Sequence, residues 1–237
     1  MQTIILAAGR GTRFGEMTQA TPKCLLKVLG KPIIARIMDA LPKDDSNIII
    51  VIGHLGEKVK RFVGARRGRH PVTYVEAEPT LGTAGALWHA RHLLKDTFLV
   101  LNGDDIVTRA SVAALVRRAP SFGFMRRRAP SAKYRDVILD QKGCVTRLAK
   151  TRTGGTLPII RVATGAYVLD ASIFRYKPVR LKSGELGLPQ TIMKMAARRC
   201  VRGVPMPGTL FINNREDLMF AEDKLRVSGA SRRGGGR

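Results

Sequence analysis

Short apolar segments alternate with segments of helical periodicity through the first half of the chain. The apolar runs, of strand length, cover residues 3–8, 47–53, 72–77 and 97–105. Between the first two runs, residues 31–41 place isoleucine, methionine and leucine on one face of a helix. Strands that alternate with helices form βαβ units. The pattern therefore predicts an α/β domain with a largely parallel sheet.

The second half of the chain is less regular, and it contains no internal repeat and no linker that would divide it. Residues 135–140 and 144–150 are typical of a hairpin around the turn sequence QKG. A last helical pattern covers residues 214–226, and the remainder is rich in Gly, Ser and Arg. We expect one domain over residues 1–226, followed by a disordered basic Gly/Arg tail over residues 227–237.

The sequence contains no candidate for a membrane span or a signal peptide. No apolar run reaches the roughly 18 residues that a span needs, and no basic region precedes the apolar start of the chain. The three cysteines, Cys24, Cys144 and Cys200, are widely spaced and odd in number, which argues against a disulfide framework. We expect a soluble, cytoplasmic protein with free and mostly buried thiols.

The charge is strongly positive. With 42 Lys and Arg against 18 Asp and Glu, the formal net charge is +24. Basic residues gather in residues 58–69, 117–128 and 231–237, and such a field attracts polyanions. A nucleic acid or an acidic polymer is therefore one candidate partner. Few aromatic residues stand among the basic clusters to act as stacking platforms, so we favour a solvated basic surface.

A strand runs into a glycine-rich loop in the stretch LAAGRGTRFGEMTQATPKCLL, residues 6–26. The glycines let backbone N–H groups approach an anion such as a triphosphate closely. The spacing matches neither the P-loop nor the dinucleotide fingerprint. Two cations follow, Arg13 and Lys23, and they are suited to neutralise the charge of a departing pyrophosphate. Surface charge without this role is the alternative interpretation.

A second candidate site is the sequence LNGDDIV, where a buried strand ends in Gly103, Asp104 and Asp105. Ligands of open α/β sheets bind at the carboxyl ends of strands. A carboxylate there suits Mg²⁺, which is usually shared with substrate phosphates. Asp104 is the expected ligand, and Asp105 is expected to cap the following turn. An acidic turn without a metal is the alternative.

A third stretch, EPTLGTAGALWHA at residues 78–90, begins a helix after a strand. Its small residues let a flat base lie against the backbone, and Thr83 is expected to be the helix N-cap. Taken as a capped helix alone, the stretch indicates no function. Of the four histidines, only His89 and His92 have a close spacing, and we interpret both as helix residues rather than metal ligands.

Together these stretches resemble the sugar-phosphate nucleotidyltransferases, NTP-dependent enzymes that make NDP-sugars. The family pattern LAAGxGTR followed by PK stands at residues 6–23, LGTAGAL at residues 81–87, and GD at residues 103–104. The similarity continues in TGAYVLD (164–170), SGELGLPQTI (183–192) and FINNREDLMFAEDKL (211–225). The resemblance implies a three-layer α/β/α, Rossmann-like domain with a mixed, mainly parallel sheet.

The resemblance also implies roles for individual residues. The expected nucleotide-binding residues are Leu6, Ala8, Gly9, Gly11, Thr12, Arg13, Gly82 and Thr83. The expected acceptor-binding residues are Lys150, Thr164, Gly165 and Glu185. Arg13, Lys23 and Asp104 are the expected catalytic residues: Arg13 binds the β- and γ-phosphates and Lys23 bridges the acceptor phosphate and the α-phosphate. Asp104 and Asn213 would hold Mg²⁺.

The implied reaction is Mg²⁺-dependent transfer of NMP from an NTP to a sugar 1-phosphate, with release of pyrophosphate. The chain departs from the family at Ala149, where a glutamate is usual, and at Ala163, where an asparagine is frequent. It also has EAEPT before LGT, where many members have a glutamine. These departures leave the base and the acceptor open. The alternatives are a cytidylyltransferase for a non-sugar phosphate such as phosphocholine, or a non-catalytic relative that binds RNA or an acidic partner. A homo-oligomer is compatible with either.

Overall fold

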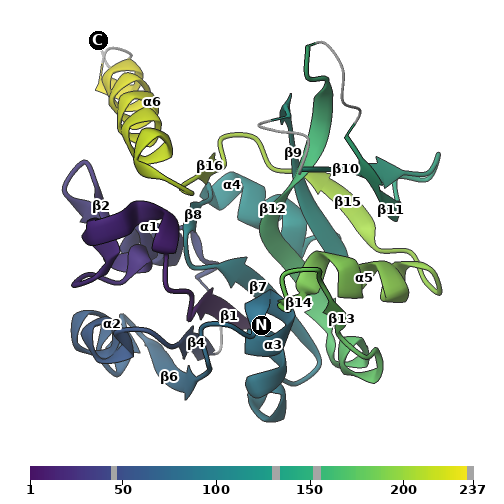
Figure 1. Ribbon diagram of the computed structural model, residues 1–237, viewed down its shortest axis with the longest axis horizontal. Helices are drawn as coiled ribbons and strands as arrows, with labels where there is room; N and C mark the ends of the chain where they lie inside the picture. Colours follow the sequence, from purple (N-terminus) through teal and green to yellow (C-terminus); the bar gives the residue numbers. More distant parts are fainter. Residues whose placement is uncertain (44–46, 130–133, 152–155, 234–237) are drawn as a thin grey trace.

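The computed structural model describes residues 1–43, 47–129, 134–151 and 156–233, with only the backbone described for residues 228–233. Within these ranges, the central element of the fold is a sheet of eight strands (Figure 1). In spatial order these are β15 (Arg202–Pro205), β9 (Ser121–Arg128), β12 (Ile159–Asp170), β7 (Thr97–Asn102), β1 (Gln2–Ala7), β4 (Asn47–Ile52), β6 (His70–Glu76) and β5 (Arg66–Arg67).

The sheet is mixed and mainly parallel, which confirms the predicted fold class. Strand β1 pairs in parallel with β4 and β7, β4 pairs in parallel with β6, and β15 does so with β9. Strand β12 runs antiparallel to both β7 and β9, and β5 is antiparallel to β6. Parallel sheets are buried on both faces, which is why β1 and β4 read as continuous apolar runs.

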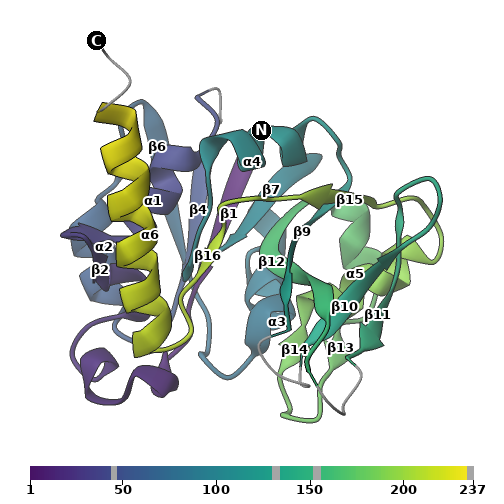
Figure 2. The same ribbon diagram turned by 90° about the horizontal axis from the view of Figure 1, so that it is seen from above.

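Helices cover both faces of the sheet. Successive side chains of a strand point to opposite faces, so Ile5 packs on one layer of helices and Ile4 on the other. The first layer contains α1 (Ile33–Ala40), α2 (Gly56–Val63), α4 (Arg109–Val116) and α6 (Arg215–Arg233). The second contains α3 (Gly82–His89) and α5 (Leu188–Ala196). Figures 1 and 2 show α6 beside α1, at the edge of the molecule. No helix in these described ranges has the length and apolar character that crossing a bilayer requires.

Four small ladders connect loops to this framework. They are β2 (Lys27–Val28) with β3 (Lys31–Pro32), β8 (Asp105–Ile106) with β16 (Leu210–Phe211), β10 (Arg135–Leu139) with β11 (Val145–Lys150), and β13 (Val179–Arg180) with β14 (Leu186–Gly187). The β10–β11 pair is the hairpin predicted around QKG. The β8–β16 pair brings the segment before α6 to the end of β7.

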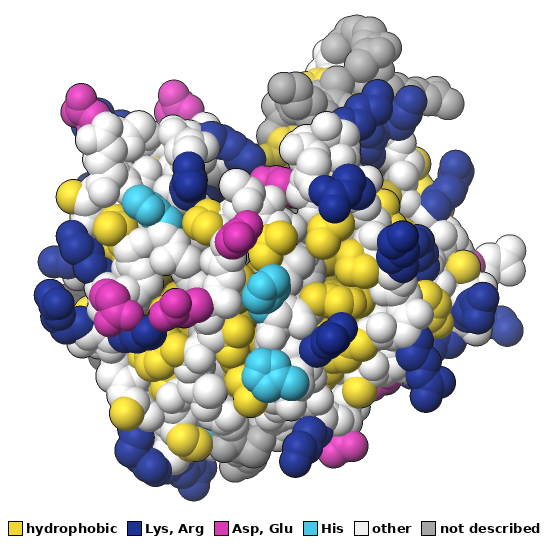
Figure 3. Space-filling view, turned by 60° about the horizontal axis from the view of Figure 1, so that its bottom comes forward, with side chains coloured by type: hydrophobic (Ala, Val, Ile, Leu, Met, Phe, Trp, Pro, Cys, Tyr) yellow, Lys and Arg dark blue, Asp and Glu magenta, His cyan; other side chains and the backbone are white. Residues whose placement is uncertain are grey.

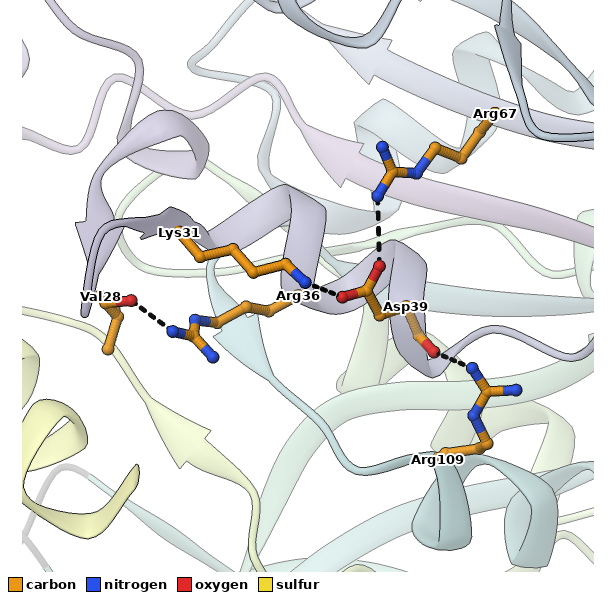
Figure 4. A network of polar contacts seen from close by, with 6 residues as sticks. All are labelled: Val28, Lys31, Arg36, Asp39, Arg67 and Arg109. Atoms are coloured by element: carbon orange, nitrogen blue, oxygen red, sulfur yellow. Dashed lines mark hydrogen bonds and ion pairs between the residues drawn. The ribbon is translucent and has the colours of Figure 1, made fainter. Parts of the chain in front are cut away.

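Asp39 on α1 joins three elements on the surface (Figure 4). Its carboxylate accepts hydrogen bonds from Lys31 and from Arg67 of β5, the latter at 3.2 Å. Its backbone carbonyl accepts one from Arg109 at the start of α4. Partial burial alone would raise the pKa of Asp39, but the hydrogen bonds and charges of Lys31 and Arg67 together hold it below its usual value. The contacts tie α1 to β3, β5 and α4.

The thiol prediction is wrong for two of the cysteines. Cys144 and Cys200 form a disulfide with a Cα–Cα distance of 5.3 Å, within the usual range for such a bond. It joins the β10–β11 hairpin to the segment after α5. Tertiary packing brings these segments together from positions 56 residues apart, a proximity that sequence spacing does not reveal. Cys24 is free and buried, as predicted.

The structure also differs from the predicted element boundaries. Strand β9 lies inside the sheet, although residues 117–128 were interpreted only as a basic cluster. Helix α6 continues through Arg233, so the expected boundary at residue 226 falls within a helix. Residues 234–237 of the predicted tail lie outside the described residues.

Candidate active site

A cavity of about 580 Å³ lies where β1 and β7 end side by side. This is the edge of a parallel sheet at which ligands of α/β proteins bind. The walls include every residue expected to bind the nucleotide: Leu6, Ala8, Gly9, Gly11, Thr12, Arg13, Gly82 and Thr83. They also include Lys23, Asp104, Glu185 and Asn213. The structure therefore brings most of the predicted site residues to one cavity.

The glycine-rich loop is held by hydrogen bonds to its own backbone. The carbonyl of Gly11 accepts from the backbone N–H of Phe14 at 2.9 Å and from the hydroxyl of Thr18 at 3.0 Å. Thr18 is buried, so these bonds anchor the loop to the interior. Arg10 and Arg13 remain exposed at the cavity. An anion in the cavity would thus meet two guanidinium groups on a backbone that is already fixed.

Two cation–oxygen pairs cross the cavity. The ammonium of Lys23 donates to Asp104 Oδ2 at 2.5 Å, and Arg13 Nη1 donates to Asn213 Oδ1 at 3.3 Å. The Lys23 side chain is only 13% exposed, and that of Asp104 is 36% exposed. Both cations come from the first 23 residues, and both oxygens come from segments far along the chain. One ligand in the cavity could therefore contact both the two positive charges and the two oxygens, which are of the kind that binds metal ions.

Short hydrogen bonds fix the segments that carry the two oxygens. The backbone N–H of Gly103 donates to the carbonyl of Leu6 at 2.8 Å, which holds the end of β7 against β1. The N–H of Asn213 donates to Asp217 Oδ2 at 2.8 Å, and the N–H of Asp217 donates to Asn214 Oδ1 at 2.8 Å. Asn213 is thereby attached to the first turn of α6.

The opposite wall is formed by β14 and the start of α3. Gly82 has φ +72°, and a Cβ there would lie 2.7 Å from the carbonyl oxygen of Leu186. Glycine is therefore required both by the backbone conformation and by the close approach. The N–H of Leu186 donates to the carbonyl of Leu81 at 2.9 Å. These contacts place Glu185 at the cavity, next to the expected base-binding residues.

Thr83 does not cap α3, contrary to the prediction. Its hydroxyl accepts a hydrogen bond from the backbone N–H of Leu188 at 3.1 Å, and the position before the helix is Leu81, which makes no side-chain cap. The hydroxyl thus joins the start of α3 to the start of α5. Thr83 still lines the cavity, so its nucleotide-binding role stays a prediction.

The structure does not bring three of the expected acceptor residues to the cavity wall. Thr164 is buried, and its hydroxyl donates to the sulfur of Met206 at 3.1 Å. Gly165 packs so closely on Asn102 that a Cβ would lie 2.2 Å from Asn102 Nδ2. Lys150 lies exposed at the end of β11. Glu185 alone of the expected acceptor residues lines the cavity described here.

Sequence reasoning missed Arg10, Glu78 and Asn102, which also line the cavity. Arg10 lies between two loop glycines, and Asn102 directly precedes Gly103. Both could have been predicted to line the cavity from their position next to the motifs. Glu78 begins the stretch before α3, and its type alone gave no signal.

Burial changes the acid–base properties of two neighbours of the cavity. Desolvation, together with the charge of Asp104, raises the pKa of the Cys24 thiol to about 12. The same two causes raise the pKa of Asp105 well above its usual range. Asp105 was expected to cap the following turn, but it is 7% exposed and belongs to β8. The cap of α4 is Thr108, whose hydroxyl accepts from the N–H of Ser111 at 3.1 Å.

The oxygens of Asp104 and Asn213 fit Mg²⁺ shared with a substrate. Mg²⁺ prefers oxygen ligands and usually takes only one or two carboxylates, with phosphates and water completing its shell. In the described ranges no group of three His, Cys, Asp or Glu side chains could hold a metal. Asp104 and Asn213 could therefore hold a Mg²⁺ ion whose remaining ligands come from substrate phosphates and water. The structure places His89 on α3, which agrees with its interpretation as a helix residue, and its Nδ1 lies 3.1 Å from the carbonyl oxygen of Gly85.

Comparison with known proteins shows the family of the chain. Residues 2–201 match the model of the family described as "Nucleotidyl transferase". A "Bifunctional protein GlmU" of Thermus thermophilus is 33% identical over 239 aligned positions, which cover 94% of this chain and 51% of the relative. The protein of that name from Methanococcus maripaludis strain C7 is 27% identical over 210 residues, with 88% and 50% coverage. The chain spans about half the length of these relatives.

Solved structures show the same fold. A UDP-glucose pyrophosphorylase complexed with UDP-glucose superposes with a TM-score of 0.76 at 17% identity, covering 96% of this chain and 98% of that one. A Bacillus anthracis protein, named as a candidate glucose-1-phosphate thymidylyltransferase and complexed with a sucrose, gives a TM-score of 0.78 at 24% identity, covering 95% of both chains. The family match, the relatives and the shared fold lead to one conclusion: the chain belongs to the nucleotidyl transferase family, in agreement with the resemblance of its sequence to the sugar-phosphate nucleotidyltransferases.

Proposed function

We propose that the protein transfers NMP from an NTP to a sugar 1-phosphate, giving an NDP-sugar and pyrophosphate, with Mg²⁺ as its cofactor. The observation that carries the proposal is the convergence of Arg13, Lys23, Asp104 and Asn213 on one cavity at the strand ends. The names of the relatives support it, since the solved structures include a UDP-glucose pyrophosphorylase with its NDP-sugar.

The reaction forms one bond and breaks one. A phosphate oxygen of the sugar 1-phosphate attacks the α-phosphorus of the NTP, and the bond from that phosphorus to the bridging oxygen breaks as pyrophosphate leaves. Catalysis of this type depends on positioning and charge neutralisation rather than on a covalent intermediate. Arg13 binds the β- and γ-phosphates, and Lys23 lies where it can contact both reacting phosphates.

The remaining residues would orient the substrates. Asp104 and Asn213 would hold Mg²⁺, which when bound offsets phosphate charge and helps to align the triphosphate. Gly82 and Thr83 lie at the wall where a flat base fits against the backbone. Glu185 offers a carboxylate acceptor for sugar hydroxyls. We place the reaction in the cytoplasm, where an NTP-dependent enzyme meets its nucleotide.

The test is pyrophosphate release, measured for each NTP with a panel of sugar 1-phosphates and with phosphocholine. The proposal predicts Mg²⁺-dependent release with at least one sugar 1-phosphate. Release with phosphocholine alone would instead favour the cytidylyltransferase. Asp104→Ala is expected to abolish release, whereas Asp223→Ala, an exposed acid on α6, provides the matched control. Equal release by wild type and Asp104→Ala would remove the metal assignment.

The positive charge does not favour a nucleic acid partner over catalysis. On the face shown in Figure 3, Lys and Arg side chains are scattered over the surface, with apolar and other residues between many of them. Several cations elsewhere are engaged in the fold, as Lys31, Arg67 and Arg109 are at Asp39. A binding module also has no need of the residues that converge at the cavity. The catalytic proposal therefore explains more of the described molecule.

A further inference from the structure

The side chain of Lys23 is enclosed along most of its length. Its stem packs against the glycine-rich loop, where a Cβ on Gly11 would lie 3.0 Å from the Cβ of Lys23. Its ammonium lies 5.6 Å from the centre of the Phe14 ring, a distance typical of a cation–π contact, and 2.5 Å from Asp104 Oδ2. In the described part of the chain, Asp104 is the only hydrogen-bond partner of this ammonium. The charge of Lys23 therefore depends on Asp104 for its compensation.

The carboxylate that holds Lys23 is also the expected ligand of Mg²⁺. A carboxylate paired with an ammonium is a poor ligand for a second cation, because the two cations repel each other at a separation of a few ångströms. Displacement of the ammonium would leave a charge on a side chain that is 13% exposed, without its partner and nearly without water. Free Mg²⁺ therefore competes with Lys23 for Asp104 under unfavourable conditions.

A triphosphate changes this competition, because it offers the ammonium another acceptor. Lys23 and Asp104 line the same cavity as Arg10 and Arg13, the two guanidinium groups that an anion would meet. Phosphate oxygens accept strong, charge-assisted hydrogen bonds from ammonium groups. Asp104 without Lys23 would in turn repel a triphosphate unless a metal ion neutralised its charge. The metal and the triphosphate therefore each favour the binding of the other.

The second cation–oxygen pair of the cavity has the same composition. Nη1 of Arg13 donates to Asn213 Oδ1 at 3.3 Å, and this oxygen is the acceptor atom of the Asn213 side chain. Arg13 is exposed, so its release from Asn213 is less costly than the release of Lys23. Each expected metal ligand is thus paired with a cation that is expected to bind phosphate.

We propose that Lys23 and Mg²⁺ exchange on Asp104, and that the ammonium gives up the carboxylate only when a triphosphate receives it. The metal and the triphosphate then raise each other's affinity by the same factor. The inference rests on the proposed function, which supplies both ligands. With the ammonium on Asp104 for about nine-tenths of the time, the apparent Kd for free metal is about tenfold higher than that of the open carboxylate.

The first measurement is the affinity for Mn²⁺ without nucleotide, from the paramagnetic resonance signal of the free ion. Mn²⁺ prefers the same oxygen ligands as Mg²⁺. Lys23→Met removes the charge and retains an unbranched stem, and it should bind Mn²⁺ about tenfold or more tightly than the wild type does. The double variant Lys23→Met, Asp104→Asn should lose this gain, which would place the gained affinity at Asp104.

Arg10→Met is the matched control, because it removes an exposed cation from the same cavity wall and leaves the Lys23–Asp104 pair in place. We expect it to change the Mn²⁺ affinity about threefold or less, since an exposed charge is screened by salt. A gain in Arg10→Met as large as that in Lys23→Met would reduce the effect to the net charge of the wall and overturn the exchange.

The second measurement is calorimetric binding of Mg²⁺ together with inorganic triphosphate, a probe that does not depend on the base. Here the sign reverses: Lys23→Met should bind the pair about tenfold or more weakly than the wild type, because the phosphates lose a charged donor. A variant with a damaged site would bind both free metal and metal triphosphate more weakly. Opposite signs in the two titrations therefore separate the exchange from a structural role of Lys23.

The third measurement uses the wild type and so does not depend on the folding of a variant. The NMR signal of the Lys23 ammonium, assigned by its loss in Lys23→Arg, should stay in place when Mg²⁺ alone is added. It should move when Mg²⁺ and inorganic triphosphate saturate the site. Movement with Mg²⁺ alone overturns the exchange, and so does a signal that stays in place at saturation.

The outcomes distinguish this inference from the proposed function. A folded Lys23→Met variant that binds Mn²⁺ no more tightly than the wild type overturns the inference, as does a gain that persists without Asp104. Absence of pyrophosphate release with every NTP and sugar 1-phosphate overturns the proposed function instead. The Mn²⁺ titrations need neither substrate, so they still decide whether Lys23 and a metal ion compete for Asp104.

Discussion

The ammonium group of Lys23 lies 2.5 Å from the carboxylate of Asp104, although 81 residues separate them in the chain. Lys23 follows the glycine-rich loop, and Asp104 follows the end of β7. The contact therefore joins the side of the cavity that would bind phosphates to the side that would bind Mg²⁺. Because the Lys23 side chain is only 13% exposed, Lys23 without Asp104 would be an uncompensated charge with little access to water.

Lys23→Ala is expected to lower kcat/KM for pyrophosphate release about 100- to 1,000-fold, the usual cost of removing one preorganised group that stabilises developing charge. The measurement is steady-state pyrophosphate release at saturating Mg²⁺. Lys27→Ala, an exposed lysine on β2, is the matched control and should retain wild-type activity. Equal activity of the two variants would contradict the assigned role of Lys23.

Gly82→Ala should destabilise the protein by about 1–3 kcal/mol, because alanine is strained at positive φ. The new methyl group would also meet the Leu186 carbonyl, which must then move away from the cavity. Chemical denaturation measures the loss of stability, and KM for the NTP reports the change in the wall. Gly64→Ala provides the control, since Gly64 has a similar φ but open space around it. A smaller loss at Gly82 than at Gly64 would rule out the close contact.

Thiol titration should find no reactive cysteine in the native, unreduced protein and one per chain after unfolding. Two cysteines form the disulfide, and burial raises the pKa of the Cys24 thiol to about 12, so little thiolate exists near pH 8. Cys24→Ala should lower the count after unfolding to zero. Two or more thiols in the unreduced, unfolded protein would exclude the Cys144–Cys200 bond.

Replacement of both Cys144 and Cys200 by serine should lower the free energy of unfolding by up to about 4 kcal/mol. This is the loop-entropy estimate for a cross-link between residues 56 apart. Differential scanning calorimetry and urea denaturation would measure it. Reduction of the wild type should produce a comparable loss, and a reduced protein as stable as the oxidised one would be inconsistent with the estimate.

Asp39→Asn should lower stability at neutral pH by less than about 1 kcal/mol, since the ion pairs of Asp39 are solvent-exposed. The folded-state pKa of Asp39 lies below its unfolded value. Its contribution is therefore present above pH about 4 and is lost as the pH falls through the folded pKa. Urea denaturation from pH 7 to pH 3 should show the two proteins converging in acid. A difference that grows in acid would contradict the sign.

The parts of the site that were predicted correctly in position are short segments whose order in the chain matters. Gly11, Arg13 and Lys23 fall within one stretch, so a local pattern was sufficient to place them together. Asp104 could be placed because it ends an apolar strand. In each case local sequence determines local backbone, and the parallel sheet then brings the strand ends together.

The features that the sequence did not place where the structure has them depend on irregular pairing or on distant packing. Between Ala163 and Tyr167 the register of β12 on β9 shifts, and Thr164 is directed to Met206 rather than to the cavity. Bulges of this kind redirect side chains without a periodic signal. Strand β9 was missed because it contains Gly123 and ends in three arginines. Thr83 was misassigned because its partner, the N–H of Leu188, lies 105 residues away.

The contact between Arg13 and Asn213 spans 200 residues, and this has a consequence for the order of events during translation. The ribosome adds about 5–20 residues per second, so the loop that carries Arg13 emerges many seconds before the segment that carries Asn213. A nascent chain that has completed β1, β7 and Asp104 still lacks the amide that closes the cavity from the other side. The site is therefore assembled late, by the same segment that docks α6 onto the finished sheet.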